Sequence, residues 1–260
     1  MILITSLYPI KNKDRLQEIE SVIIRNSQNE FIDKIIVFFE NYEKVDKEEY
    51  NFLNNNKISI VQLQHRPTFG MFLEYANTKL IDEVVIVSNS DILFDKTINR
   101  VKELPLGCKN IHLLSRYEGD YKANREFMPC GIQVGTFQTW SFDSYIFKSP
   151  IQLDRNYSYY SILFGSNNSD PSLYRIFKSE GFKIRNPVFD IRSFHIHSVS
   201  GEGNVDVGVD YNSIYGNLNV EPLYAGTVDG LTYRYNILNP PNSCMTRMGF
   251  IRDDVIISHN

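Results

Sequence analysis

The chain has 260 residues, of which 42% are hydrophobic and 22% are charged, so it can build a substantial core and is neither fibrous nor disordered. Its formal net charge of −4 gives no support to a nucleic-acid partner, because proteins that bind nucleic acids present basic surfaces. No apolar run is long enough for a transmembrane segment.

The three cysteines, Cys108, Cys130 and Cys244, are scattered and lack the spacing of a metal site. An odd, scattered set argues against a disulfide framework and for a reducing compartment. The apolar start at residues 1–7 is too short for a secretion signal with its cleavage site, and is better explained as the first strand. We therefore expect a cytoplasmic protein.

The first hundred residues alternate between apolar runs and amphipathic segments. Helices are predicted from about Asp14, which has capping-box spacing to Gln17, and from about Arg66 to Leu80. Buried strands are predicted at residues 2–7, 35–39, 58–63 and 84–87. This alternation predicts an α/β fold, with a doubly wound, mostly parallel sheet flanked by helices.

Beyond residue 100 the pattern is less regular. Asp170-Pro171 has the form of a helix N-cap followed by proline at the first helical position. Residues 199–260 lack helical periodicity, and we expect an irregular or β-rich C-terminal extension there. Further strands are predicted at residues 110–118 and 142–147, with a last strand or strand pair at 184–197.

The strand at 84–87 runs into a polar interruption, Asn89-Ser90-Asp91, before apolar residues resume at Ile92. In an open α/β sheet, ligands bind at the carboxyl edge, where this carboxylate would emerge. A carboxylate inside apolar sequence needs a partner, and a divalent cation that carries a diphosphate is a good candidate. The alternative is that Asp91 only caps a turn.

Other polar residues follow strand ends at the same edge of the predicted sheet: Thr5, Ser6, Glu40 and Arg66. A nucleotide would bind there. The sequence contains no G-x-G-x-x-G or Walker A segment, so a dinucleotide-binding or P-loop protein is not supported.

Four segments in family order resemble the motifs of GT-A-type glycosyltransferases, in particular the inverting, family-2-like enzymes. Asn89-Ser90-Asp91-Ile92 resembles the D-x-D signature, with Asn in its first place. Residues 169–175, at the start of a predicted helix, and residues 180–184 after it resemble an E-D-x-x-L-x-x-R…G-F/Y-x-I motif of inverting enzymes, with Ser169 where Glu is usual. The matching segments are 89–92, 114–117, 141–148 and 169–175 followed by 180–184, and together the resemblance covers about residues 1–198.

The resemblance implies a metal site and a catalytic base. Asp91 would hold Mn²⁺ or Mg²⁺ together with His195 or His197, which point to one face of a strand because they alternate with Ile196. Each histidine could instead be a hydrogen-bonded structural residue. Asp170 matches the base of inverting enzymes, although it could be only an N-cap. Asp143 is the second candidate, as base or acceptor-hydroxyl ligand, unless it simply pairs with Arg116.

By resemblance, the chain would move a sugar from a UDP-, GDP- or dTDP-sugar to a glycan or other hydroxyl acceptor. Residues 1–100 would bind the donor, residues 101–198 would form the acceptor and catalytic half, and residues 199–260 would be a cap or extension. Peripheral association with a membrane-bound acceptor stays open. The expected donor contacts are Thr5, Ser6, Glu40, Arg66, Asn89, Ser90, Asp91 and Arg116.

Two alternatives stay open. Sugar nucleotidyltransferases usually carry a Gly-rich, basic loop after the first strand, but residues 8–13 contain no glycine, which disfavours that class. A non-catalytic nucleotide-sugar or glycan binder on the same fold is supported by the departures at Asn89 and Ser169. The sequence does not identify the sugar, the nucleotide base or the acceptor.

Overall fold

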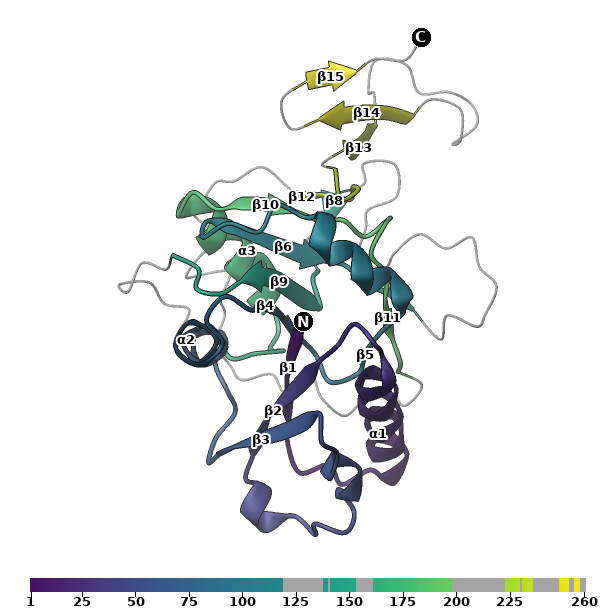
Figure 1. Cartoon of the computed structure of the whole chain (residues 1–260), viewed down its shortest axis with the longest axis vertical. Helices are drawn as coiled ribbons and strands as arrows, with labels where there is room; N and C mark the ends of the chain where they lie inside the picture. The colour runs from purple at the N-terminus through teal and green to yellow at the C-terminus, as the bar shows by residue number, and fades with distance from the viewer. Residues whose placement is uncertain are drawn as a thin grey trace.

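The computed structural model describes residues 1–118, 138–139, 141–152, 161–197, 223–229, 231–235, 248–252 and 255–257. Its centre is a seven-stranded sheet in the order β10-β6-β9-β4-β1-β2-β3 (Figure 1). Only β9 runs antiparallel to its neighbours within this sheet. The predicted mostly parallel α/β sheet is confirmed. The strands are β1 Ile2–Leu7, β2 Lys34–Glu40, β3 Ile58–Leu63, β4 Val84–Ser88, β6 Asn110–Leu114, β9 Ser144–Lys148 and β10 Lys183–Arg185.

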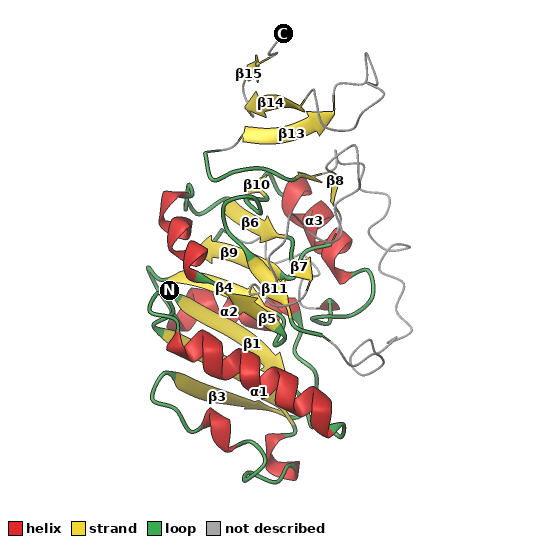
Figure 2. Cartoon of the chain, turned by 90° about the vertical axis from the view of Figure 1, so that its right-hand side faces the viewer, coloured by secondary structure: helices red, strands yellow, loops and turns green. Residues whose placement is uncertain are grey.

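Helices cover both faces of this sheet, as expected of a doubly wound fold. Helix α1 lies across one face (Figure 2), and its apolar side packs with alternate residues of β1 and β2. Helices α2 and α3 pack against the other face. The α-helices are α1 Lys13–Gln28, α2 Phe69–Lys79 and α3 Ser169–Ser179, and the 3₁₀ helices are η1 Tyr42–Lys44, η2 Asn51–Leu53 and η3 Lys96–Glu103.

Two predicted helix caps are wrong. Helix α1 is capped by Asn12, whose side chain accepts from the backbone N–H groups of Asp14 and Arg15, so Asp14 and Gln17 form no capping box. Helix α3 is preceded by Asn168 with φ of 60°, a left-handed conformation that asparagine tolerates better than most residues. Asp170 therefore lies inside the first turn of α3, and its carboxylate is free for contacts other than capping.

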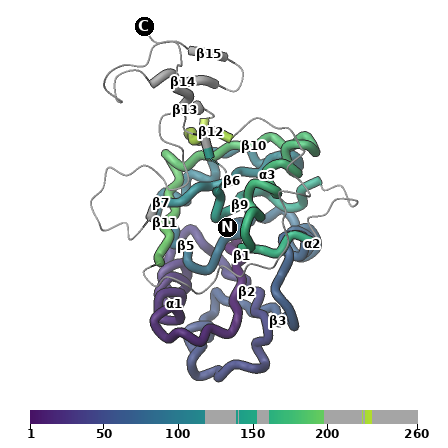
Figure 3. Tube along the Cα trace, turned by 180° about the vertical axis from the view of Figure 1, so that it is seen from behind, coloured from purple at the N-terminus to yellow at the C-terminus, as the bar shows by residue number. Residues whose placement is uncertain are grey.

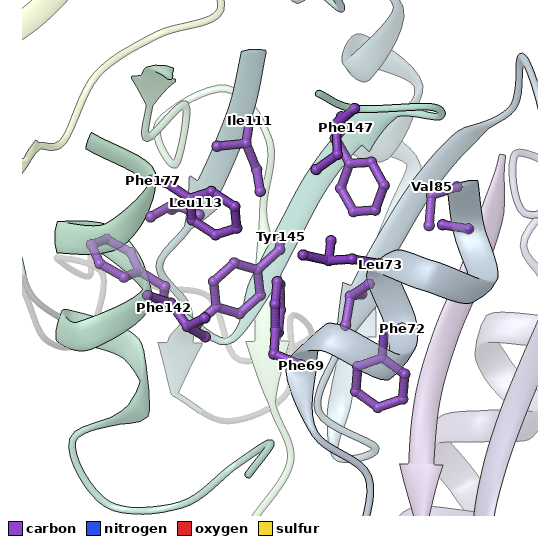
Figure 4. Packing of buried hydrophobic residues seen from close by; sticks show 14 of the residues in the cluster. Phe69, Phe72, Leu73, Val85, Ile111, Leu113, Phe142, Tyr145, Phe147 and Phe177 are labelled. Atoms are coloured by element: carbon purple, nitrogen blue, oxygen red, sulfur yellow. The ribbon is translucent and has the colours of Figure 1, made fainter. Parts of the chain in front are cut away.

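An aromatic core joins α2 and α3 to the sheet (Figure 4). The ring of Phe69 packs on Tyr145 of β9 with centroids 4.5 Å apart, and on Phe177 of α3 at 6.0 Å. Such pairs contribute about 0.5–1.5 kcal/mol each beyond the area that they bury. This cluster holds α3 against α2 and β9.

A second, three-stranded sheet in the order β5-β11-β7 lies beside α1. Its strands are β5 Ile92–Phe94, β7 Tyr117–Glu118 and β11 Ser193–His195. The segment predicted as a last strand or strand pair is thus two strands, β10 and β11, in different sheets, and the strand predicted at 110–118 is divided between β6 and β7. The antiparallel register places His195 opposite Ile92.

The described part of the predicted C-terminal extension consists of short strands. β12 Leu223–Tyr224 pairs with β8 Gln138–Thr139, and β13 Leu231–Tyr235, β14 Met248–Arg252 and β15 Val255–Ile257 form an antiparallel sheet. The tube in Figure 3 shows β1 near the middle of the molecule. Among the described helices, none has both the length and the apolar character needed to cross a bilayer.

Candidate functional site

A cavity of about 890 Å³ opens at the carboxyl ends of the parallel strands. It lies where an open α/β sheet binds its ligands. Of the predicted donor-contact residues, all but Thr5 line this cavity, and so do Asp143, His195 and His197. Thr5 is buried, and it lines a small separate pocket together with Ile23 and Asn26 of α1.

Asp91 is a buried carboxylate of the cavity wall. It is 8% exposed, and its Oδ2 accepts from Arg15 Nη2 at 2.5 Å and from His195 Nε2 at 3.1 Å. Burial alone would raise the pKa of Asp91, but the hydrogen bond and charge of His195 and the charge of Arg15 together lower it to about 2. The other oxygen, Oδ1, is buried without a hydrogen-bond partner in the described part of the chain. In native proteins such an acceptor is satisfied by a water molecule or an ion, so Oδ1 is available to a ligand.

His195 and His197 complete a candidate metal centre with Asp91. Their rings stack at 5.1 Å between centroids and 9° between planes. One potential ligand atom from each of the three residues lies within 4.8 Å of the others. Burial, together with the charges of Arg15 and His195, lowers the pKa of His197, which favours the neutral imidazole that binds metals. The predicted convergence of strand β4 and the downstream histidines is therefore what the structure shows.

Arg15 belongs to this site, and the sequence analysis missed it. It lies in the first turn of α1 and is 5% exposed, with Nη1 donating to Glu18 at 3.1 Å and to the Ile196 carbonyl at 3.4 Å. A signal was present, because Arg15 occupies the same helical face as the buried Ile19 and Val22. A cation inside an apolar stripe requires a buried anion.

Asp143 forms a second charged cluster on the cavity wall. Its two oxygens both accept from Arg116 Nη1, at 2.7 and 2.8 Å, and Oδ1 also accepts from Asn89 Nδ2 at 3.1 Å. Burial raises the pKa of Asp143 despite the opposing charge of Arg116. The expected alternative, a pairing of Asp143 with Arg116, is thus present, and it leaves Asp143 in contact with the cavity.

Asp170 lies close to this cluster but is not part of the cavity lining. Its Oδ2 accepts from the backbone N–H of Phe142 at 3.1 Å, and its Oδ1 accepts from the hydroxyl of Tyr145 at 2.9 Å. Burial and the negative charge of Asp143 raise the pKa of Asp170 to about 7. A carboxyl group in this range can exchange a proton near neutral pH.

Arg66 reaches the cavity but uses its donors on the protein backbone. Its Nε donates to the Phe164 carbonyl and its Nη2 to the Gly165 carbonyl, both at 2.8 Å. Gly165 has φ of +65°, and a Cβ there would lie 3.2 Å from Arg66 Nη2. Arg66 therefore holds the segment before α3, a role that the sequence did not indicate.

Comparison with known proteins supports the fold and not a sequence family. No protein-family model matches the sequence, and no curated protein matches it. Among solved structures, TarS from S. aureus in complex with UDP-GlcNAc aligns with a TM-score of 0.50 at 13% identity, over 78% of this chain and 60% of that one. The chain has a GT-A-like α/β fold.

Two further alignments are weaker. The mannosyltransferase PcManGT from Pyrobaculum calidifontis, solved with GDP-Man and Mn²⁺, gives a TM-score of 0.48 at 12% identity, over 76% of this chain and 58% of that one. The inositol-1-phosphate CTP transferase from T. maritima gives a TM-score of 0.41 at 12% identity, over 83% of this chain and 95% of that one. The chain spans about three-fifths of TarS and of PcManGT.

Proposed function

We propose that this chain is a glycosyltransferase that moves a sugar from a nucleotide-sugar donor to a glycan or other hydroxyl acceptor, with a divalent cation and with inversion at the anomeric carbon. The observation that carries the proposal is the meeting of Asp91, His195 and His197 in one cavity at the carboxyl edge of the sheet. A donor set of one carboxylate and two imidazoles can hold a divalent transition-metal ion, and the unpartnered Asp91 Oδ1 offers a ligand atom.

Charge complementarity supports a diphosphate in the same cavity. Arg15, Lys11 and Arg116 line it near the candidate metal centre. The bound cation would supply Lewis-acid stabilisation of the departing nucleoside diphosphate. Ser6 and Glu40, at the ends of β1 and β2, would contact the nucleoside. We keep the expected division into a donor half at 1–100, an acceptor half at 101–198 and a C-terminal extension.

The base that accepts the proton of the acceptor hydroxyl is one of two carboxylates. Asp170 matches the base of the resembled family, and its pKa near 7 suits proton transfer at neutral pH. Asp143 is the second candidate because it lines the cavity, although its bonds to Arg116 commit both oxygens. We assign the base to Asp170 on the family match and the raised pKa, and the positioning of the acceptor to Asp143, which lines the cavity. To act as the base, Asp170 would have to exchange its hydrogen bond with Phe142 or Tyr145 for one with the acceptor hydroxyl.

Donor hydrolysis provides the direct test. The protein is incubated with UDP-, GDP- and dTDP-sugars and Mn²⁺, and slow release of the nucleoside diphosphate is measured. We expect turnover of one donor class, binding without transfer in Asp170→Asn, and retained partial transfer in Asp143→Asn. Binding without any turnover that Asp170→Asn leaves unchanged would favour a non-catalytic binder.

A parallel assay addresses the nucleotidyltransferase alternative. The protein is given a nucleoside triphosphate and a sugar 1-phosphate, and release of pyrophosphate is measured. We expect none, because residues 8–13 lack the glycine-rich loop that such enzymes use to hold a triphosphate. Pyrophosphate release that depends on the sugar phosphate would replace the proposed function.

A further inference from the structure

Arg15 has an unusual position for a buried cation. Its side chain is 6% exposed and lies in the first turn of α1, where the helix dipole disfavours positive charge. Desolvation adds a further cost. Two carboxylates, Asp91 and Glu18, offset these costs, and only Asp91 is a candidate metal ligand. The same oxygen of Asp91 thus serves Arg15 and His195.

Both partners of this ion pair keep one buried polar atom without a hydrogen-bond partner in the described residues. These atoms are Nε of Arg15, a donor, and Oδ1 of Asp91, an acceptor. Most buried polar groups in native proteins are satisfied by protein, water or a ligand, so both atoms are available to a ligand that enters the cavity. A ligand that carries both a divalent cation and anionic oxygens would satisfy the two atoms together, with the cation on Asp91 and a phosphate oxygen on Arg15.

We propose that Arg15 is an exchangeable counter-ion: it neutralises Asp91 in the metal-free site and becomes a ligand of the donor's diphosphate when a divalent cation takes Asp91. The inference rests on the proposed function and deepens it by naming the residue that links the cation to the diphosphate. Other arginines of the cavity serve this purpose less well. Arg66 donates to two backbone carbonyls, and Arg116 donates to Asp143.

The competing explanation is a permanent structural ion pair. A permanent pair predicts that loss of Arg15 weakens the site as a whole, because Asp91 would be left as an unpaired buried charge. The exchange predicts opposite effects on two ligands. Without Arg15, the cation alone binds more tightly since its competitor is gone, whereas the diphosphate binds less tightly since one of its ligands is gone.

Calorimetric titration of the wild-type protein and Arg15→Gln tests this difference. Glutamine is neutral and can still donate to Asp91, so it avoids an unpaired carboxylate. We expect Arg15→Gln to bind Mn²⁺ alone about tenfold more tightly, equivalent to ~1.4 kcal/mol. We expect it to bind inorganic pyrophosphate with saturating Mn²⁺ about tenfold more weakly. Arg100→Met is the matched control, because it removes a partly exposed arginine paired with Glu103 and Asp190 and should change neither affinity.

The outcomes separate this inference from the proposed function. A wild-type protein that binds no Mn²⁺ overturns the metal-dependent function and this inference together. A wild-type protein that binds Mn²⁺, with unchanged or weaker Mn²⁺ binding in Arg15→Gln, overturns the exchange alone. Unchanged pyrophosphate affinity in the variant removes Arg15 from the diphosphate ligands.

A measurement on the wild-type protein covers the case in which Arg15→Gln does not fold. The ¹⁵N resonance of the Arg15 Nε–H group is followed while Mg²⁺, and then pyrophosphate, is added. We expect one shift on addition of Mg²⁺, as Asp91 is released, and a second with pyrophosphate. A resonance that responds to neither addition contradicts the proposal.

Discussion

The neighbouring carboxylates Asp143 and Asp170 predict an unusual pH dependence of stability. The pKa of Asp170 in the folded protein is about 7, against an ordinary value of 3.8. Between these two values the folded state holds a proton that the unfolded state has released, so the free energy of unfolding falls as pH rises. This contribution is fully present below pH 4 and is lost as pH passes through 7. Asp170→Asn cannot titrate, and the variant should lack it.

The expected size follows from the position of Asp170. From pH 5 to the folded pKa of about 7 is about two pH units, so the wild type would lose on the order of 2–3 kcal/mol on going from pH 5 to pH 8. A loss of this size is well within the resolution of denaturant unfolding.

The assay is urea unfolding of the wild type, Asp170→Asn and Glu74→Gln at pH 5 and pH 8. Glu74 is exposed on α2 and serves as the control for loss of one carboxylate. The absolute stability of Asp170→Asn is not diagnostic, because the amide cannot accept both hydrogen bonds that Asp170 accepts from Phe142 and Tyr145. The diagnostic quantity is the change between the two pH values. An equal change in the wild type and Asp170→Asn would refute the raised pKa.

Three other substitutions test separate parts of the structure. Asp91→Ala should abolish Mn²⁺ binding measured by calorimetry, and full activity of the variant in EDTA would show that the metal assignment is wrong. Gly165→Ala should lower stability by about 1–3 kcal/mol in denaturant unfolding, because alanine is strained at φ of +65° and its Cβ would crowd Arg66; an unchanged midpoint would contradict this. Phe69→Ala should cost about 3–5 kcal/mol in the same assay through the cavity left in the aromatic core, and a cost below ~1 kcal/mol would mean that the core collapses around the site.

The sheet was predictable because its strands are written as continuous apolar runs. The predicted strands at 2–7 and 58–63 coincide with β1 and β3. Helix starts were less predictable, because a cap depends on the local backbone as well as on residue type. Helix α3 begins at Ser169, after Asn168 in a left-handed conformation, and not after Asp170 as predicted. The dipeptide Asp170-Pro171 is compatible with either start, so the sequence does not distinguish an N-cap at Asn168 from one at Asp170.

The candidate site likewise contains residues that the sequence predicted and residues that it did not. The meeting of Asp91 with the histidines was predictable from the rule that strand ends gather at one edge of an open sheet. The bond between Arg15 and Asp91 joins residues 76 positions apart, and the bonds of Arg66 reach carbonyls 98 and 99 positions away. Arg15 could have been found in the sequence, as a charged residue on the otherwise apolar face of α1. The bonds of Arg66 could not have been predicted, because its partners are backbone carbonyls, which every residue has.

The register between β5 and β11 fixes the position of His195 relative to Asp91 in the candidate metal centre. Phe194 lies opposite Leu93 and His195 opposite Ile92, and the next backbone amide, that of Ile196, donates to the carbonyl of Asp91 at 2.9 Å. A slip of one residue would exchange inward and outward side chains, and the imidazole would leave its carboxylate. Insertions before β11 would therefore be tolerated, whereas a single-residue insertion inside β11 would not. The number of residues between Asp91 and the histidines can thus change while their spacing in three dimensions stays fixed.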